Sequence, residues 1–111
     1  MARKKIKAAK DERFIVERVQ TGVRLEKRLL KVLKGLAEYH DMSLGDLLEG
    51  IVLHAFDGKH PFSEETRRRI DDLKRIYALD LDSTASHRLM EPADVPEVKQ
   101  AAQKPRRRGK R

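Results

Sequence analysis

The sequence predicts a mainly α-helical fold in which one short strand precedes three helices, and it predicts that two chains fold together. Residues 14–25 are rich in β-branched side chains, and their second half alternates between apolar and polar. The apolar spacing then changes to the helical period, and no second strand-like run follows. Because a single strand cannot satisfy its own backbone hydrogen bonds, its partner is expected to come from another chain.

Composition limits the chain to a small intracellular domain. The 111 residues have room for one such domain with flexible ends, and 40% of them are charged. There is no cysteine, which excludes disulfides, thiol catalysis and Cys-ligated zinc. No apolar run has the length of a bilayer span or of a signal peptide. We therefore expect a cytoplasmic protein without a membrane partner.

The net charge of +8 is concentrated at the two ends of the chain. Residues 1–10 carry five lysines and arginines, residues 104–111 carry six, and neither stretch contains an acid, which leaves −3 for residues 11–103. Residues 35–58 contain five acids and no lysine or arginine. The folded middle is thus expected to have one basic and one acidic face.

The predicted strand has two different faces. Its apolar face holds Val19, Thr21, Val23 and Leu25, and its polar face holds Arg18, Gln20, Gly22 and Arg24. Because alternate residues of a strand point to opposite sides, the first set is expected to be buried and the second to face a ligand or solvent.

Two helices are predicted directly after the strand. Residues 26–39 place leucines at helical spacing with lysines and Arg28 on the outer side. Ser43 followed by Asp46 is typical of a helix N-terminus, and the helix it begins is expected to end near Asp57 and Gly58. The second helix has too many apolar residues for one stripe, which again indicates a partner subunit.

A third helix is predicted from Ser63 to about Leu79, with a narrow apolar stripe of Ile70, Leu73, Ile76 and Tyr77. The chain therefore divides into a basic flexible arm (1–13), a dimerisation and DNA-binding domain (14–57), a C-terminal helical appendage (58–90) and a disordered basic tail (91–111). The tail is predicted from its prolines and its final run of basic residues.

The order of these elements resembles the ribbon-helix-helix (MetJ/Arc-type) DNA-binding family over residues 18–57. The residues that carry the resemblance are Thr21 to Leu25, then Leu29, Leu33 and Leu36, then Met42 to Leu48 and Ile51. The resemblance implies an intertwined homodimer whose intermolecular two-stranded antiparallel β-ribbon lies in the major groove of DNA. It also implies a repressor or a DNA organiser associated with the nucleoid.

The resemblance assigns roles to particular residues. The base-reading positions are Gln20, Gly22 and Arg24. The DNA phosphate contacts are Arg18, Lys27, Arg28, Ser43, Leu44 and Gly45. The dimer core is Val23, Leu25, Leu29, Leu33, Leu36, Leu47, Leu48 and Ile51. Arg24 suits guanine and Gln20 suits adenine, because each offers a bidentate match, whereas Gly22 has no side chain with which to read a base.

Two other functions are compatible with the sequence. The first is an antitoxin-like protein-interaction module in which residues 63–79 bind a partner protein. This function is favoured if the apolar stripe of the third helix is exposed, and it is weakened if the stripe is buried against the protein itself. The second is a helix-turn-helix with residues 44–56 in the groove, which the acidic side chains of Asp46 and Glu49 oppose.

The sequence offers no catalytic or metal site. There is no nucleophile with a matching base and no Gly-rich phosphate loop. The four histidines are His40, His54, His60 and His87, and no two of them stand four residues apart on one helix. We therefore expect a protein that is not an enzyme and needs neither metal nor cofactor.

Overall fold

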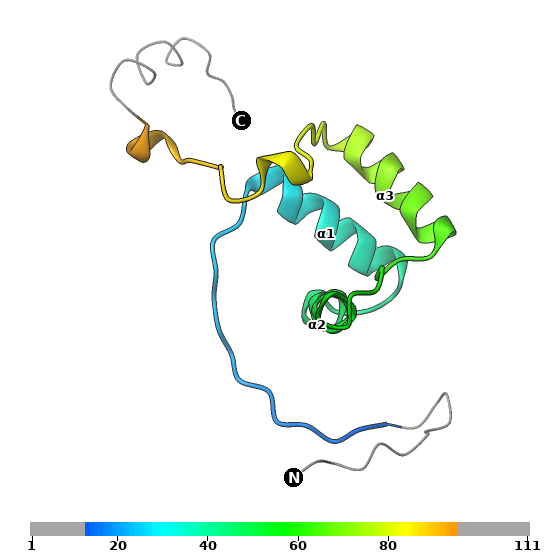
Figure 1. The fold of residues 1–111 in the computed structure, drawn as a ribbon. Coiled ribbons are helices and arrows are strands. Elements are labelled where there is room, and N and C mark those ends of the chain that lie inside the picture. Colours follow the sequence, from blue (N-terminus) through cyan, green and yellow to red (C-terminus); the bar gives the residue numbers. More distant parts are fainter. Residues whose placement is uncertain (1–12, 96–111) are drawn as a thin grey trace.

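The computed structural model describes residues 13–95, which form three α-helices and two short 3-10 turns (Figure 1). The helices are α1 (Lys27–Tyr39), α2 (Leu44–Phe56) and α3 (Glu64–Ile76), and the turns are η1 (Ser83–Ala85) and η2 (Pro92–Asp94). All three helices that the sequence predicts are confirmed. None of them is long and apolar enough to cross a bilayer over the described range.

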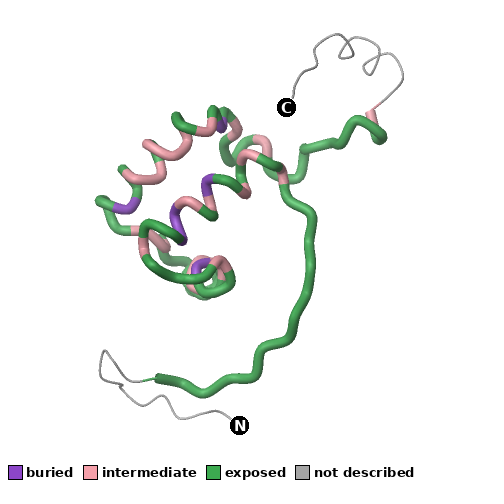
Figure 2. Tube along the Cα trace, turned by 180° about the vertical axis from the view of Figure 1, so that it is seen from behind, coloured by how far each residue is buried: buried purple, intermediate pink, exposed green. Residues whose placement is uncertain are grey.

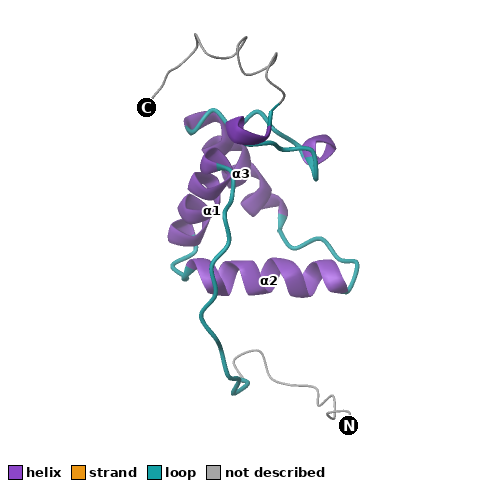
Figure 3. Cartoon of the chain, turned by 90° about the vertical axis from the view of Figure 1, so that its left-hand side faces the viewer, coloured by secondary structure: helices purple, strands orange, loops and turns teal. Residues whose placement is uncertain are grey.

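The predicted strand is wrong, and with it the β-ribbon and the intertwined ribbon-helix-helix fold. Residues 13–26 contain no strand, and residues 13–95 contain none elsewhere. The segment is extended and runs past the helices as a long loop (Figure 3). A strand requires backbone hydrogen bonds to a neighbouring strand, and no other stretch of the described chain supplies them. The alternation of apolar and polar residues therefore accompanies an extended conformation that belongs to no sheet.

Helices α1 and α3 lie side by side and antiparallel, and α2 crosses one end of the pair (Figures 1 and 3). The Tyr39 hydroxyl at the end of α1 donates to Glu65 at the start of α3 over 2.9 Å. At the opposite end, Arg28 donates to the carbonyl of Ala78 over 3.0 Å. Midway, a Cβ on Gly35 would lie 2.9 Å from a methyl of Leu73, so the glycine permits this close approach.

The core is small and lies where the three helices meet (Figure 2). Leu36 is 1% exposed and packs with Ala37 and Leu47, and five partly buried side chains surround them: Leu33, Ile51, Phe62, Ile70 and Leu73. Helix α3 thus contributes to the same core as α1 and α2.

The predicted dimer-core residues divide into two groups. Leu36 and Leu47 are buried within the single chain, while Leu33, Leu48 and Ile51 are half-buried. The others are open to solvent, with exposed fractions of 36% for Leu29, 41% for Leu25 and 75% for Val23. The chain therefore buries the part of this set that lies toward the middle of α1 and on α2, and leaves the part near the extended segment uncovered.

Each helix has a capped beginning. Ser43 accepts a hydrogen bond from the amide of Asp46 over 3.1 Å, as the sequence predicts, and Ser63 does the same for Thr66. The cap of α1 is Glu26, which accepts from the amide of Leu29 over 2.8 Å. Satisfying these amides fixes where each helix starts.

Each helix also ends in the same way. The second residue after each helix has a positive φ, 56° at Asp41, 71° at Gly58 and 55° at Ala78. The amide that follows then donates back to a carbonyl five residues earlier, as from Lys59 to His54 over 2.8 Å. This is the Schellman arrangement, which satisfies carbonyls at the helix end.

Candidate nucleic-acid interface

Residues 13–25 form an extended segment that is exposed along its whole length, as the green tube in Figure 2 shows. Gln20, Gly22 and Arg24, the predicted base-reading residues, therefore all reach solvent. A Cβ added at Gly22 would meet no atom within 4 Å. The three positions are therefore not covered by other parts of the described chain, apart from the contact of Arg24 with Glu91.

Arg24 does not stand alone, because its guanidinium holds the carboxylate of Glu91. Its Nε donates to Oε2 over 3.2 Å, and its Nη2 donates to Oε1 in a second, closer contact. This pairing raises the pKa of Arg24. Both side chains are largely exposed, 82% for Arg24 and 57% for Glu91, so the pair is surrounded by water. A surface pair of this kind is weak and open to competition from other anions.

Arg18 makes a similar contact with Glu49 of α2. Its Nε and Nη2 donate to the two carboxylate oxygens over 2.7 and 2.6 Å. The hydrogen bond from Arg18 lowers the pKa of Glu49. This exposed pair links the first half of the extended segment to the outer face of α2, and a hollow of about 660 Å³ lies between the segment and the helix.

Arg28 has a structural role at the start of α1. Its Nη1 donates to the carbonyl of Ala78 over 3.0 Å and to Asp80 over 2.9 Å, and its Nε donates to Glu26 over 3.0 Å. The side chain therefore ties the start of α1 to the residues that follow α3. Among the residues predicted to contact phosphate, Arg28 makes the most hydrogen bonds within the described chain.

Lysines form an exposed row along α1. Lys27, Lys31 and Lys34 stand four and three residues apart, so they share one face of the helix. None of them has an ion-pair partner among residues 13–95, and the Lys31 ammonium lies 5.6 Å from the centre of the Tyr77 ring. This row begins three residues after Arg24 and continues its positive charge along the helix.

Ser43, Leu44 and Gly45 are at the beginning of α2, where the resemblance places a phosphate contact. Ser43 Oγ is the helix cap, Leu44 is half-buried, and a Cβ on Gly45 would meet nothing within 4 Å. Within the described residues, no hydrogen bond or ion pair joins these three positions to residues 20–24. The structure therefore presents them as an open helix end.

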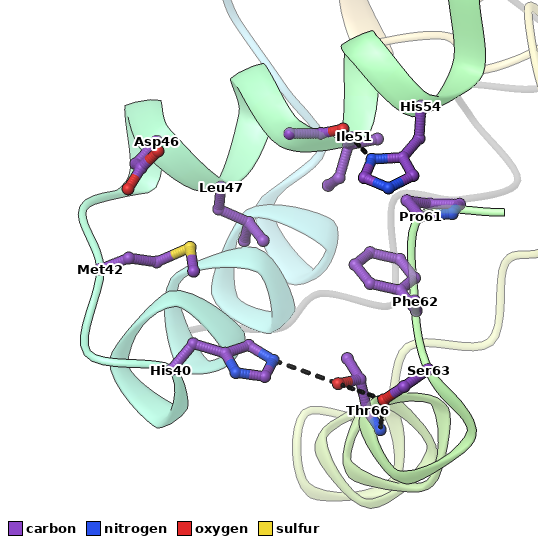
Figure 4. Close-up of a pocket in the computed structure, with 11 residues that line it drawn as sticks. His40, Met42, Asp46, Leu47, Ile51, His54, Pro61, Phe62, Ser63 and Thr66 are labelled. Carbon is purple, nitrogen blue, oxygen red and sulfur yellow. Dashed lines mark hydrogen bonds between the residues drawn. The ribbon is translucent and has the colours of Figure 1, made fainter. Parts of the chain in front are cut away.

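A cavity of about 390 Å³ lies between α2 and the start of α3 (Figure 4). His40 Nε2 lies 3.3 Å from Thr66 Oγ1, and the Ser63 hydroxyl donates to that same oxygen over 3.1 Å. Thr66 is 7% exposed and is the buried polar residue of the described chain. This network joins the end of α1 to the start of α3, which is a structural role.

The histidines do not assemble a metal centre. His40 and His54 line the same cavity, but His54 Nδ1 lies 2.8 Å from the carbonyl of Gly50 on its own helix. Residues 13–95 hold no group of three or more side chains placed to bind a metal ion. His60 and His87 are exposed elsewhere.

Sequence reasoning missed the carboxylates that pair with the predicted DNA contacts. Glu49, Asp80 and Glu91 lie 31, 52 and 67 residues from the arginines they bind. Periodicity and helix caps report on neighbours within a few residues, so no local pattern marks these pairs. The acid-rich composition of residues 35–58 was the one available signal, and it applies to Glu49 alone.

No family model, no curated protein and no solved structure matches this chain. The predicted basic arm, apart from Arg13, and residues 96–111 of the predicted tail lie outside the described residues.

Proposed function

We propose that this chain is a cytoplasmic double-stranded DNA-binding protein that acts as a dimer, as a repressor or a DNA organiser. The observation that supports this most is the composition of the extended segment. Residues 13–25 carry the predicted base-reading residues and several large apolar side chains, and all of them are open to solvent. An apolar segment of this kind favours a protein partner, and its cations favour a polyanion.

The apolar part of the proposal rests on two neighbouring surfaces. On the segment, Phe14 is 74% exposed and Val19 is 80% exposed, and on the outer face of α2, Leu53 is 64% and Phe56 is 80% exposed. Removing such side chains from water favours association by about 1.5–3 kcal/mol each when burial is complete. A second copy can cover both surfaces in one contact.

Charge complementarity favours a second copy as the partner. The segment carries three arginines and one glutamate, and α2 carries acids without lysine or arginine, as the Arg18–Glu49 pair illustrates within one chain. In two copies related by a two-fold axis, the extended segment of each copy faces α2 of the other. The contact between arginines and acids therefore forms twice. A partner of unrelated sequence would have to reproduce both the apolar and the charged pattern.

The DNA part of the proposal rests on the distribution of cations. Arg24 is followed by the lysine row of α1, and a dimer presents two such rows. The ends of the chain add eleven cations without an acid in residues 1–10 and 104–111. Contacts of this kind neutralise phosphates and give affinity, while Arg24 and Gln20 give a modest base preference from the extended segment.

The experiment is a titration of a fluorescent duplex with the full chain by anisotropy at several salt concentrations between about 50 and 200 mM. We expect the logarithm of the affinity to fall linearly with the logarithm of the salt concentration. Deletion of residues 104–111 is expected to make that slope shallower. An absence of binding at the lowest salt, or a slope of zero, contradicts the proposal.

The antitoxin-like alternative has less support, because the stripe on α3 offers little free surface. Ile70 and Leu73 pack against the core, and Tyr77 is half-buried beside Lys31. Ile76 alone is widely exposed, at 68%. A partner protein bound through residues 63–79 would therefore contact one exposed apolar side chain of the stripe, whereas the antitoxin-like alternative requires an exposed apolar helix face.

A further inference from the structure

Three arginines that the sequence assigns to DNA are each held by a carboxylate from a distant part of the chain. Arg18 pairs with Glu49, Arg24 with Glu91 and Arg28 with Asp80. A guanidinium that holds a carboxylate through two parallel donors has the geometry that also holds a phosphate or the edge of guanine. Arg18 and Arg24 each hold their carboxylate through two donors, whereas Arg28 gives Asp80 one. Glu49 and Glu91 therefore occupy sites that suit an anion or acceptor of DNA.

The Arg24–Glu91 pair differs from the other two because neither of its residues belongs to an α-helix. Arg18 binds Glu49 of α2, and Arg28 of α1 also binds the Ala78 carbonyl. Glu91, in contrast, belongs to residues 86–94, which are all exposed, and Arg24 is the side chain that binds it. Releasing this pair removes no buried contact of the described chain.

We propose that Glu91 competes with DNA for the guanidinium of Arg24 and so weakens DNA binding by the resting protein. The carboxylate keeps Arg24 neutralised until a duplex supplies another acceptor for both donors. Glu91 then acts as an intramolecular competitor at one of the three predicted base-reading positions. This inference rests on the proposed DNA-binding function and adds an intramolecular competitor to it.

The size of the effect follows from the exposure of the pair. Because both side chains are surrounded by water, the competition is modest, and removing the charge of Glu91 is expected to raise DNA affinity about two- to fivefold. The gain requires the guanidinium, so it is expected to disappear when Arg24 is absent. A purely long-range charge effect would not depend on Arg24 in this way.

The experiment compares four variants of the full chain with the wild type by anisotropy on one duplex at one salt concentration. Glu91→Gln removes the competitor, and Asp94→Asn is the matched control, because it changes the net charge equally in the same segment while Asp94 has no ion pair among the described residues. Arg24→Ala and the double variant R24A/E91Q complete the cycle.

We expect E91Q to bind more tightly than both the wild type and D94N, and R24A/E91Q to bind as weakly as R24A. Equal gains in E91Q and D94N overturn the inference, because they reduce the effect to net charge. A gain that persists in R24A/E91Q overturns it as well. Absence of binding in every variant, wild type included, overturns the proposed function itself, which separates the two failures.

Discussion

The carboxylate of Glu26 accepts a hydrogen bond from the backbone amide of Leu29 over 2.8 Å and thereby begins α1. Its second oxygen accepts from Arg28 over 3.0 Å. Partial burial acts to raise the pKa of Glu26, but the hydrogen bonds from Leu29 and Arg28 outweigh it, and the pKa is lowered overall. The ionised form is therefore the form that stabilises the fold.

Replacement of this cap is expected to destabilise the protein in a pH-dependent way. Glu26→Ala should lower the free energy of unfolding by about 0.5–2 kcal/mol at neutral pH, as for other lost N-caps. Folding lowers the pKa of Glu26, so its ionised carboxylate stabilises the folded protein at pH values above the pKa of the unfolded chain, about 4.3. This stabilisation is lost as the pH falls through the lower pKa that Glu26 has in the folded protein. Thermal melts between pH 7 and 3 measure this.

The control for that prediction is Glu26→Gln, which keeps the shape of the side chain without its charge. We expect the difference in Tm between E26Q and the wild type to shrink as the pH falls below about 4. A difference that stays constant across this range would show that the charge of Glu26 does not contribute.

Gly58 and Ala78 occupy the same position after α2 and α3, with φ values of 71° and 55°. Glycine adopts this left-handed conformation freely, whereas a residue with a Cβ is strained by roughly 1 kcal/mol. Ala78→Gly is therefore expected to raise the free energy of unfolding and Gly58→Ala to lower it, each by about 1 kcal/mol. Urea unfolding of both variants checks this, and shifts of the same sign would refute it.

The sequence could predict the helices and two of their caps, because Ser43, Ser63 and the spacing of the leucines are local signals. It could not predict that residues 14–25 form no strand. Alternation reports which side chains share a face, but a strand also needs a hydrogen-bonding neighbour. The Glu26 cap was missed because glutamate is not among the residues that cap most helices.

For the candidate site, too, local sequence patterns and the path of the chain must be considered separately. Gln20, Gly22 and Arg24 are exposed, but so are Val19, Thr21, Val23 and Leu25, which the alternation had placed on a buried face. The prediction of two different faces is therefore wrong for the single chain. The pairing of Arg24 with Glu91 depends on the path of the chain over 67 residues, and no short-range pattern encodes that path. The neutralisation of Arg24 by Glu91 therefore could not be predicted from the sequence.

The outer face of α2 is expected to control self-association. Phe56→Ser should raise the dissociation constant of the dimer at least about tenfold, because Phe56 is 80% exposed in one chain and would lose its burial in the dimer. Ile76→Ser on α3 is the control, since Ile76 is also exposed, at 68%, but lies on neither proposed surface. Sedimentation measures both constants, and equal effects would contradict the assignment of this face.

Base preference is expected to depend on Arg24. Arg24→Ala should lower the ratio between the affinities for a preferred and a random duplex about tenfold, because a bidentate contact to a base edge is lost. Arg67→Ala is the matched control, because Arg67 is an exposed arginine without an ion pair among the described residues, at the start of α3. An equal loss on both duplexes would show that Arg24 contacts phosphate and not bases.

The most direct test of the central claim is the light-scattering mass of the full chain, alone and mixed with a duplex of about 20 base pairs. We predict twice the 12.9 kDa of one chain without DNA, and a complex of one duplex with at least two chains when the DNA is added. A mass of one chain at micromolar concentration, unchanged by the duplex, would contradict both the dimer and its binding to DNA.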